Sequence, residues 1–187
     1  MSASPRILQA TIHVVATAGL EGTSVRSVAA EAGVSIGAVQ HHFKTKADLL
    51  SAAMSTVAER FRADLQARLE QAEDSRDALR QSLYALACAD QDTTPAAIWT
   101  AFAAGACVDP ALRSQHVAQW HQVEAFISSL VAAIAPQWSP DRVQDTAGVL
   151  LAMVDGIAVA RAAETDRMPA ERARRLVDIA CACHLPE

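Results

Sequence analysis

Apolar residues recur at every third or fourth position through most of this 187-residue chain. That spacing gathers them on one face of an α-helix, whereas a half-buried strand requires strict alternation. Hydrophobic residues make up 51% of the chain and aromatic residues only 4%, alanine recurs throughout, and runs of β-branched residues are scarce. Alanine and leucine favour helix, and β-branched residues favour strand. The sequence therefore predicts an all-α protein, large enough to bury a core without disulfide bonds.

Glycine, proline and capping residues divide the chain into about nine predicted helices. Gly19 ends the first helix, and Thr23 or Ser24 caps the second. Proline interrupts the later helices because it has no backbone N–H and restricts the residue before it. The predicted helices cover residues 5–18, 24–32, 36–42, 46–72, 76–90, 95–107, 111–135, 141–164 and 169–184.

The stretch GVSIGAVQHHFKTK, residues 33–46, has the pattern of a helix-turn-helix unit. Gly33 follows the helix that ends near residue 32, where a left-handed residue is common, and Ser35 can cap the next helix. Val39 and Phe43 are four residues apart, so they are expected to face inward. The remaining outward residues are small enough for close approach to a DNA major groove, where glutamine pairs with adenine and apolar groups touch thymine methyls. These outward residues are Ile36, Gly37, Ala38, Gln40 and His41.

Charge is unevenly distributed along the chain. The net charge is −5, but the first 50 residues carry four basic and three acidic residues, a net of +1, which leaves −6 for the remainder. Lys44 and Lys46, the only lysines, directly follow the helix at 36–42. Lys46 lies in the first turn of the next helix, where backbone N–H groups add positive potential and favour an anion. A few cations placed in this way, in two copies of the chain, suit contact with nucleic acid.

The stretch from Thr23 to Leu50 resembles the N-terminal domain of the TetR family of transcriptional repressors. The likeness is carried by AGVS at the end of the second helix, the His42–Phe43 pair, Lys46 and the following DLL. The resemblance implies that residues 1–47 form a DNA-binding domain for double-stranded operator DNA. Phosphate contacts are then expected from Arg26, His42 and Lys46, base contacts from the outward residues of helix 36–42, and a further contact from Ser35. The family often has tyrosine where this chain has Gln40, so a distinct operator sequence is expected.

The C-terminal two-thirds resembles the branch of the family called BetI-like, through the Trp99–Phe102 pair, the DP.LR break and DGI near residue 156. The resemblance implies that residues 48–187 form a ligand-binding and dimerisation domain. The helices at 141–164 and 169–184 carry apolar stripes with small residues that allow close helix approach, although such stripes also fit an internal core. The residues expected at a homodimer interface are Val149, Met153, Gly156, Ile157, Ala160, Leu176, Ile179 and Ala180.

A small-molecule effector is expected to bind among the helices between residues 46 and 164. Aromatic side chains are few, and a set of them can hold a quaternary ammonium group by cation–π attraction or can line an apolar pocket. Every candidate also fits an ordinary core position. The candidates are Tyr84, Cys88, Trp99, Phe102, Trp120, His121 and Met153.

Two other functions are compatible with parts of the sequence. A helical enzyme or metal protein could use His116, His121 and Glu124, and a helical interaction module would lack DNA binding. Cys181, Cys183 and the adjacent histidine lie too close along one helix to converge readily on one metal ion. No phosphate loop, HExxH motif or nucleophile motif is present. The chain is therefore predicted to be neither an enzyme nor dependent on a cofactor or metal.

The apolar runs and the cysteines indicate the cellular compartment of the protein. No uninterrupted apolar run reaches the roughly 18 residues that a membrane span needs, and the longest candidate, residues 147–160, contains Asp155. The N-terminus lacks the pattern of a cleaved signal peptide. The four cysteines lie within predicted helices, which suits reduced thiols. These features predict a cytoplasmic protein with no membrane contact.

Overall fold

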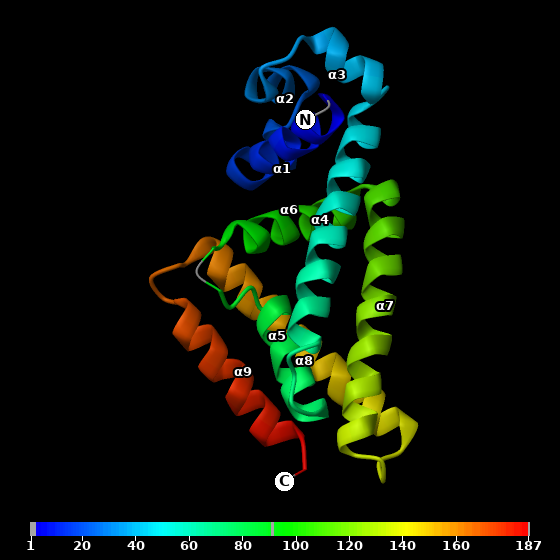
Figure 1. Ribbon diagram of the computed structural model, residues 1–187, viewed down its shortest axis with the longest axis vertical. Helices are drawn as coiled ribbons and strands as arrows, with labels where there is room; N and C mark the ends of the chain where they lie inside the picture. The colour runs from blue at the N-terminus through cyan, green and yellow to red at the C-terminus, as the bar shows by residue number, and fades with distance from the viewer. Residues whose placement is uncertain (1–2, 91, 187) are drawn as a thin grey trace. The chain divides into compact units, whose positions relative to one another are not determined.

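The computed structural model describes residues 3–90 and 92–186, and these residues form nine α-helices and no strand (Figure 1). The all-α prediction is confirmed, and each predicted helix end lies within four residues of the observed end. The helices are α1 (Ala3–Gly22), α2 (Val25–Ala32), α3 (Ile36–His42), α4 (Lys46–Leu69), α5 (Ser75–Leu86), α6 (Thr94–Val108), α7 (Pro110–Ile134), α8 (Pro140–Ala163) and α9 (Ala170–His184).

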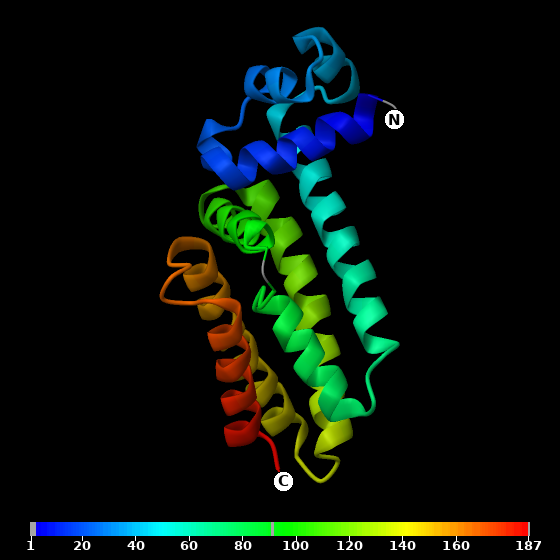
Figure 2. The same ribbon diagram turned by 60° about the vertical axis from the view of Figure 1, so that its left-hand side comes forward.

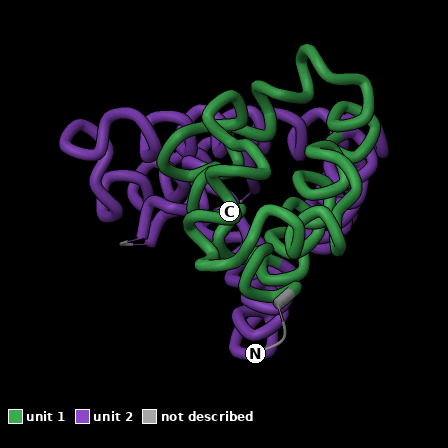
Figure 3. The backbone as a smooth tube through the Cα atoms, turned by 90° about the horizontal axis from the view of Figure 1, so that it is seen from above, with its two compact units in different colours: residues 1–61, 98–116 green, residues 62–97, 117–187 purple. Residues whose placement is uncertain are grey.

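The chain folds into two compact units (Figure 3). Unit 1 comprises residues 1–61 and 98–116, and unit 2 comprises residues 62–97 and 117–187, so α4, α6 and α7 contribute to both. Unit 1 extends beyond the boundary predicted after residue 47. The reason is that apolar residues of α6 and of the first half of α4 share a core with α1.

Unit 1 has two apolar clusters on opposite sides of α1. Ile7 of α1, Val28 of α2 and Val39 of α3 are fully buried together and hold the three N-terminal helices. On the other side, Ile12 packs with Phe102 of α6 and with residues of α4, and Figure 2 shows α6 alongside α1. The position of α3 therefore depends on α1, which is itself held by α6.

Local hydrogen bonds fix the turn between α2 and α3. Gly33 adopts the left-handed conformation, with φ 61° and ψ 40°, and closes α2 as predicted. The Ser35 hydroxyl accepts a hydrogen bond from the Ala38 N–H at 3.1 Å and starts α3. At the start of α2, Ser24 and Ser27 form a reciprocal capping box, which identifies Ser24 rather than Thr23 as the cap. These caps explain why the predicted bounds of α3 are correct.

Unit 2 is built around α8. Leu83 of α5, Ile127 of α7, Leu150 of α8 and Val177 of α9 are fully buried in one cluster. α8 is also long and apolar enough, by length and composition alone, to cross a membrane, with a mean hydropathy of 1.5 over 18 residues. Charged residues, Asp155 among them, still interrupt this helix, so it is not an uninterrupted apolar run. Within the window, 44% of the helix is buried inside the protein, and the core helix of a soluble protein passes the same test.

A buried arginine on α8 holds the segment that follows α5. Arg161 is only 3% exposed, and its guanidinium donates hydrogen bonds to the carbonyls of Cys88 (3.1 Å), Met168 (2.9 Å) and Asp90. Cys88 has a φ of 48°, which is uncommon for a residue with a side chain. The predicted continuation of this helix to residue 90 therefore fails, because Cys88 leaves the helical conformation, and the carbonyls of Cys88 and Asp90 accept hydrogen bonds from Arg161.

Candidate DNA-binding surface and effector-binding unit

α3 has one buried and one exposed face, as the recognition helix of a helix-turn-helix requires. Val39 is fully buried, and Val34 and Phe43 pack partly buried against the same cluster. Ile36 is 46% exposed although it is apolar. The other predicted base-contacting residues, Gly37, Gln40 and His41, are also exposed, and Ala38 is half-buried. All five residues thus lie on one accessible face of α3, with a small-residue N-terminus.

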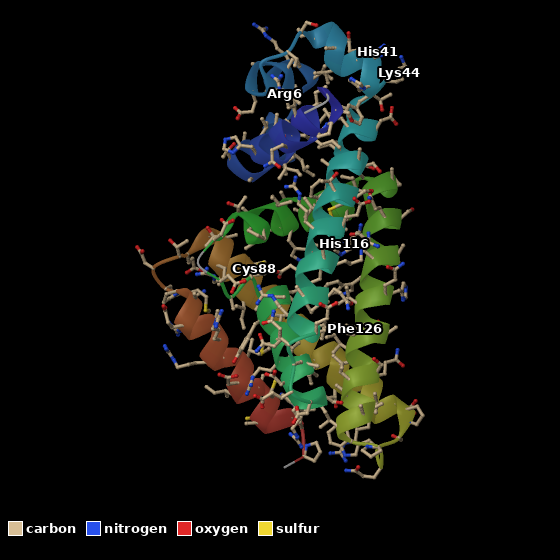
Figure 4. The ribbon with its side chains drawn as sticks, viewed as in Figure 1. Arg6, His41, Lys44, Cys88, His116 and Phe126 are labelled. Atoms are coloured by element: carbon tan, nitrogen blue, oxygen red, sulfur yellow. The ribbon has the colours of Figure 1, made fainter. Side chains whose placement is uncertain are left out.

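The C-terminal end of α3 carries a group of basic side chains. His41 and His42 are both exposed, and their rings meet edge to face with centroids 5.4 Å apart. Figure 4 shows His41 and Lys44 near each other at this end of the helix. Arg26, exposed in the first turn of α2, is the remaining predicted phosphate contact.

Lys46 is the predicted phosphate contact with the most defined surroundings. It is exposed in the first turn of α4, and its Nζ donates a hydrogen bond to the carbonyl oxygen of Leu20 at 2.8 Å. Thr45 and Asp48 cap α4 reciprocally, each side chain accepting from the other's backbone N–H at 3.0 Å. Sequence reasoning missed Leu20, because nothing in the pattern pairs a carbonyl in α1 with a lysine 26 residues later.

The predicted effector-binding residues fall into two separate clusters. Tyr84, Trp120 and Met153 belong to the unit 2 core, and Trp99 and Phe102 belong to the unit 1 cluster of α1, α4 and α6. Trp99 stacks on His116, with ring centroids 5.1 Å apart and an interplanar angle of 29°. The structure therefore brings together three of the candidates in unit 2 and two in unit 1. Of the remaining two, His121 is exposed on α7 and Cys88 is half-buried in unit 2.

Two of these side chains remain in their uncharged forms. The Tyr84 hydroxyl donates a 2.5 Å hydrogen bond to the Asp178 carboxylate, and burial together with this carboxylate raises the pKa of Tyr84 to about 12. Burial also raises the pKa of the Cys88 thiol to about 12, against the opposing effect of Arg161. Neither group is therefore an anion or a nucleophile at neutral pH.

The alternative metal or enzyme site is not supported. Among residues 3–90 and 92–186, no group of three or more His, Cys, Asp or Glu side chains is arranged to hold a metal ion. His116 lies in unit 1 against Trp99, whereas His121 and Glu124 lie in unit 2. His116, His121 and Glu124 therefore do not form such a group.

The outer surfaces of α8 and α9 show which predicted interface residues are accessible. Val149 on α8 is 47% exposed and Ile179 on α9 is 58% exposed, and Gly156 is also exposed. Ile157 and Ala160 instead lie in the core of unit 2 at 4% and 5% exposure, so one copy of the chain already covers them. Val159, 49% exposed on α8, was not among the predicted interface residues. It follows Val149 by ten residues, so the two side chains lie within about a quarter turn of each other around the helix. The other three predicted residues, Met153, Leu176 and Ala180, are partly buried against the unit 2 core.

Comparisons with known proteins agree with this arrangement. Residues 7–53 match the model of bacterial regulatory proteins of the tetR family, and residues 75–186 match that of the BetI-type transcriptional repressor C-terminal region. The HTH-type transcriptional regulator BetI of Burkholderia thailandensis is 33% identical over 158 residues, which cover 81% of this chain and 77% of the relative. BetI of Burkholderia cenocepacia is 32% identical over 159 residues, with 81% and 78% coverage.

Solved structures share the fold over nearly the whole chain. A transcriptional regulator from a Rhodococcus species superposes with a TM-score of 0.88 at 32% identity, covering 98% of this chain and 96% of that one. A protein from Saccharomonospora viridis, solved in complex with choline, has a TM-score of 0.88 at 18% identity, covering 99% and 98%. The second likeness shows the fold alone.

The chain belongs to the TetR family. Within that family it is a transcriptional regulator whose C-terminal region is of the BetI type. Both resemblances inferred from the sequence are confirmed, and these relatives are transcriptional regulators.

Proposed function

We propose that the protein is a cytoplasmic repressor that binds operator DNA as a homodimer and is released by a small-molecule effector. The observation that carries DNA binding is the accessible face of α3 beside an exposed Lys46 at the N-terminus of α4. Gln40 reads a base edge, and Arg26, His42 and Lys46 contact phosphates. A single helix of this kind reads one half-site, so two copies related by a two-fold axis place their α3 helices about 34–36 Å apart, or at a somewhat longer spacing.

Replacing Lys46 and Gln40 separately distinguishes phosphate contact from base reading. We expect Lys46→Ala to weaken binding to every duplex and to reduce the slope of log K against log salt by about 0.9 per lost phosphate contact, hence by roughly 2 per dimer. We expect Gln40→Ala to leave that slope unchanged and to relax discrimination at one or two operator positions by about 1–3 kcal/mol each. Fluorescence anisotropy over a series of salt concentrations, on duplexes selected from the source genome, measures both effects.

Arg60→Ala is a matched control for the loss of one cation. Arg60 is exposed on the same helix as Lys46, about 21 Å further along at 1.5 Å per residue, which exceeds the Debye length of about 8 Å in physiological salt. Its substitution should leave the salt slope unchanged. If Lys46→Ala and Arg60→Ala behave identically, Lys46 is not a phosphate contact, and if no genomic duplex is bound at all, the protein does not bind DNA.

The effector is proposed to bind the BetI-type region, with the cluster of Tyr84, Trp120 and Met153 as its apolar lining. The ligand must bind the released and DNA-bound conformations unequally, and a coupling of about 1–3 kcal/mol is typical for such regulators. Aromatic side chains hold quaternary ammonium groups by cation–π attraction. The choline complex of the Saccharomonospora protein makes choline the first compound to test.

Choline chloride should release the protein from its operator more effectively than sodium chloride at the same ionic strength. The comparison separates a specific effector from general screening of phosphate contacts, because both salts weaken DNA binding equally through counterions. Anisotropy of the operator complex during parallel titrations measures the difference. Superimposable titrations would show that choline is not the effector, and replacing Trp120 by leucine should abolish any difference observed.

A further inference from the structure

Leu20 makes two contacts through different parts of the same residue. Its backbone carbonyl accepts a hydrogen bond from the Lys46 ammonium at 2.8 Å and one from the Thr23 N–H at 3.3 Å. Its side chain packs with the apolar cluster of α1, α4 and α6. The same side chain lies very close to Gly105 of α6. A Cβ atom added to Gly105 would overlap Leu20 Cδ1 and would lie 3.0 Å from Leu112 Cδ1.

The local backbone explains how one residue reaches both partners. Gly19 has a φ of 69° and a ψ of −179°, which interrupts α1 immediately before Leu20. The Thr23 hydroxyl donates to the Gly19 carbonyl at 2.7 Å, and Thr23 is fully buried, so the segment after the kink is fixed. Leu20 can therefore direct its side chain to α6 and its carbonyl to Lys46.

The hydrogen bond to Leu20 orients Lys46 without saturating it. An ammonium group has three N–H donors, and the one directed at Leu20 leaves two for a phosphate oxygen. A lysine side chain that is free in solution loses substantial rotamer freedom when it is fixed. A lysine already held by a carbonyl loses less of that freedom when a phosphate arrives.

We propose that Leu20 is a positioning residue that sets the Lys46 ammonium for phosphate contact according to the position of α6. The Leu20 side chain lies against Gly105 of α6, and its carbonyl accepts a hydrogen bond from the Lys46 ammonium, so a change in the position of α6 can reach Lys46 through this one residue. α6 begins at Thr94, in a segment that belongs to unit 2, and continues through unit 1, so the same helix is shared by the effector-binding unit and the DNA-binding unit. The proposal depends on the proposed role of Lys46 in binding DNA.

Gly105→Ala tests this relation directly. The added methyl overlaps Leu20 Cδ1 and crowds Leu112 Cδ1, so the Leu20 side chain must shift. Operator binding should weaken about tenfold or more for each protomer, as for loss of a charged hydrogen bond in each, and the salt slope should fall toward that of Lys46→Ala. The same substitution should have no further effect in a Lys46→Ala background, because the group it acts through is absent. It should also have no effect in a Leu20→Ala background, because the overlapping side chain is removed. Ala104→Val, on the exposed side of the same turn, should bind as wild type.

An NMR measurement on the free protein tests the inference without DNA. The Thr23 amide shares the Leu20 carbonyl with Lys46, so its proton chemical shift should change in both Gly105→Ala and Lys46→Ala, but not in Ala104→Val. Helical circular dichroism and the melting temperature confirm that each variant is folded. An unchanged Thr23 shift in folded Gly105→Ala would overturn the role of Leu20, as would an equal loss of DNA affinity with and without Lys46. A Lys46→Ala protein that binds DNA normally would instead remove the proposed phosphate contact.

Discussion

Arg161→Leu is expected to lower the free energy of unfolding by about 3–5 kcal/mol. The guanidinium satisfies the carbonyls of Cys88, Asp90 and Met168 in a site that is 3% exposed, and each carbonyl left buried without a donor costs about 1–3 kcal/mol. Leucine regains part of that loss by burying apolar surface. Urea denaturation followed by circular dichroism measures the change.

Arg167→Leu is the matched control for this substitution. Arg167 is exposed in the turn after α8, four residues beyond its end, and pairs with Glu164 on the surface. Exposed ion pairs contribute little to stability because water and salt screen them. The variant should unfold as wild type does. An Arg161→Leu protein as stable as the control would show that the segment after α5 does not depend on this residue.

Introducing a glutamate at Val149 and at Ile179 together is expected to produce a monomer and to weaken operator binding about a hundredfold or more. Both side chains are apolar and about half exposed in one copy, and an interface that buries them would have to desolvate two unpaired carboxylates per protomer. Two linked half-site contacts exceed one by roughly 10²–10⁴ in affinity. Sedimentation velocity at micromolar concentration measures the association state, and anisotropy measures operator binding.

The same substitution at Val108 separates an interface effect from a general effect of added charge. Val108 is the most exposed large apolar residue of those described, at 81%, and it lies in unit 1, away from α8 and α9 in the chain. Val108→Glu should remain dimeric and bind the operator with little change. A double variant at Val149 and Ile179 that remains dimeric would place the interface elsewhere.

Local signals in the sequence were sufficient to predict the helix-turn-helix formed by α2 and α3. The bounds of α3 are correct because Gly33, Ser35 and the inward Val39 determine them within a few residues. The family could also be predicted, because its motifs are contiguous from Thr23 to Leu50. Contacts between distant residues could not be predicted in this way, and the hydrogen bond from Lys46 to Leu20 is one of them.

The C-terminal region was harder to predict because α8 is apolar around most of its circumference. An apolar stripe shows that a residue avoids water, but it does not show whether the covering side chain comes from the same copy. Ile157 and Ala160 are therefore core residues, whereas Val149 and the unpredicted Val159 are exposed. Nothing in the sequence indicated that Arg161 is buried, since a lone arginine near a helix end usually lies on the surface.

Unit 1 is discontinuous in sequence, and this determines how the protein can be recombined with others. The side of α1 that faces away from α3 is covered by Ile98, Phe102 and Ala106 of α6, which come some 40 residues after α4 leaves the unit. A chimaera that joins residues 1–47 to a foreign sensor would expose that side of α1 unless the sensor supplies an equivalent helix. Exchange of operator specificity between regulators of this kind is therefore safest when residues 98–116 are transferred together with the N-terminal segment.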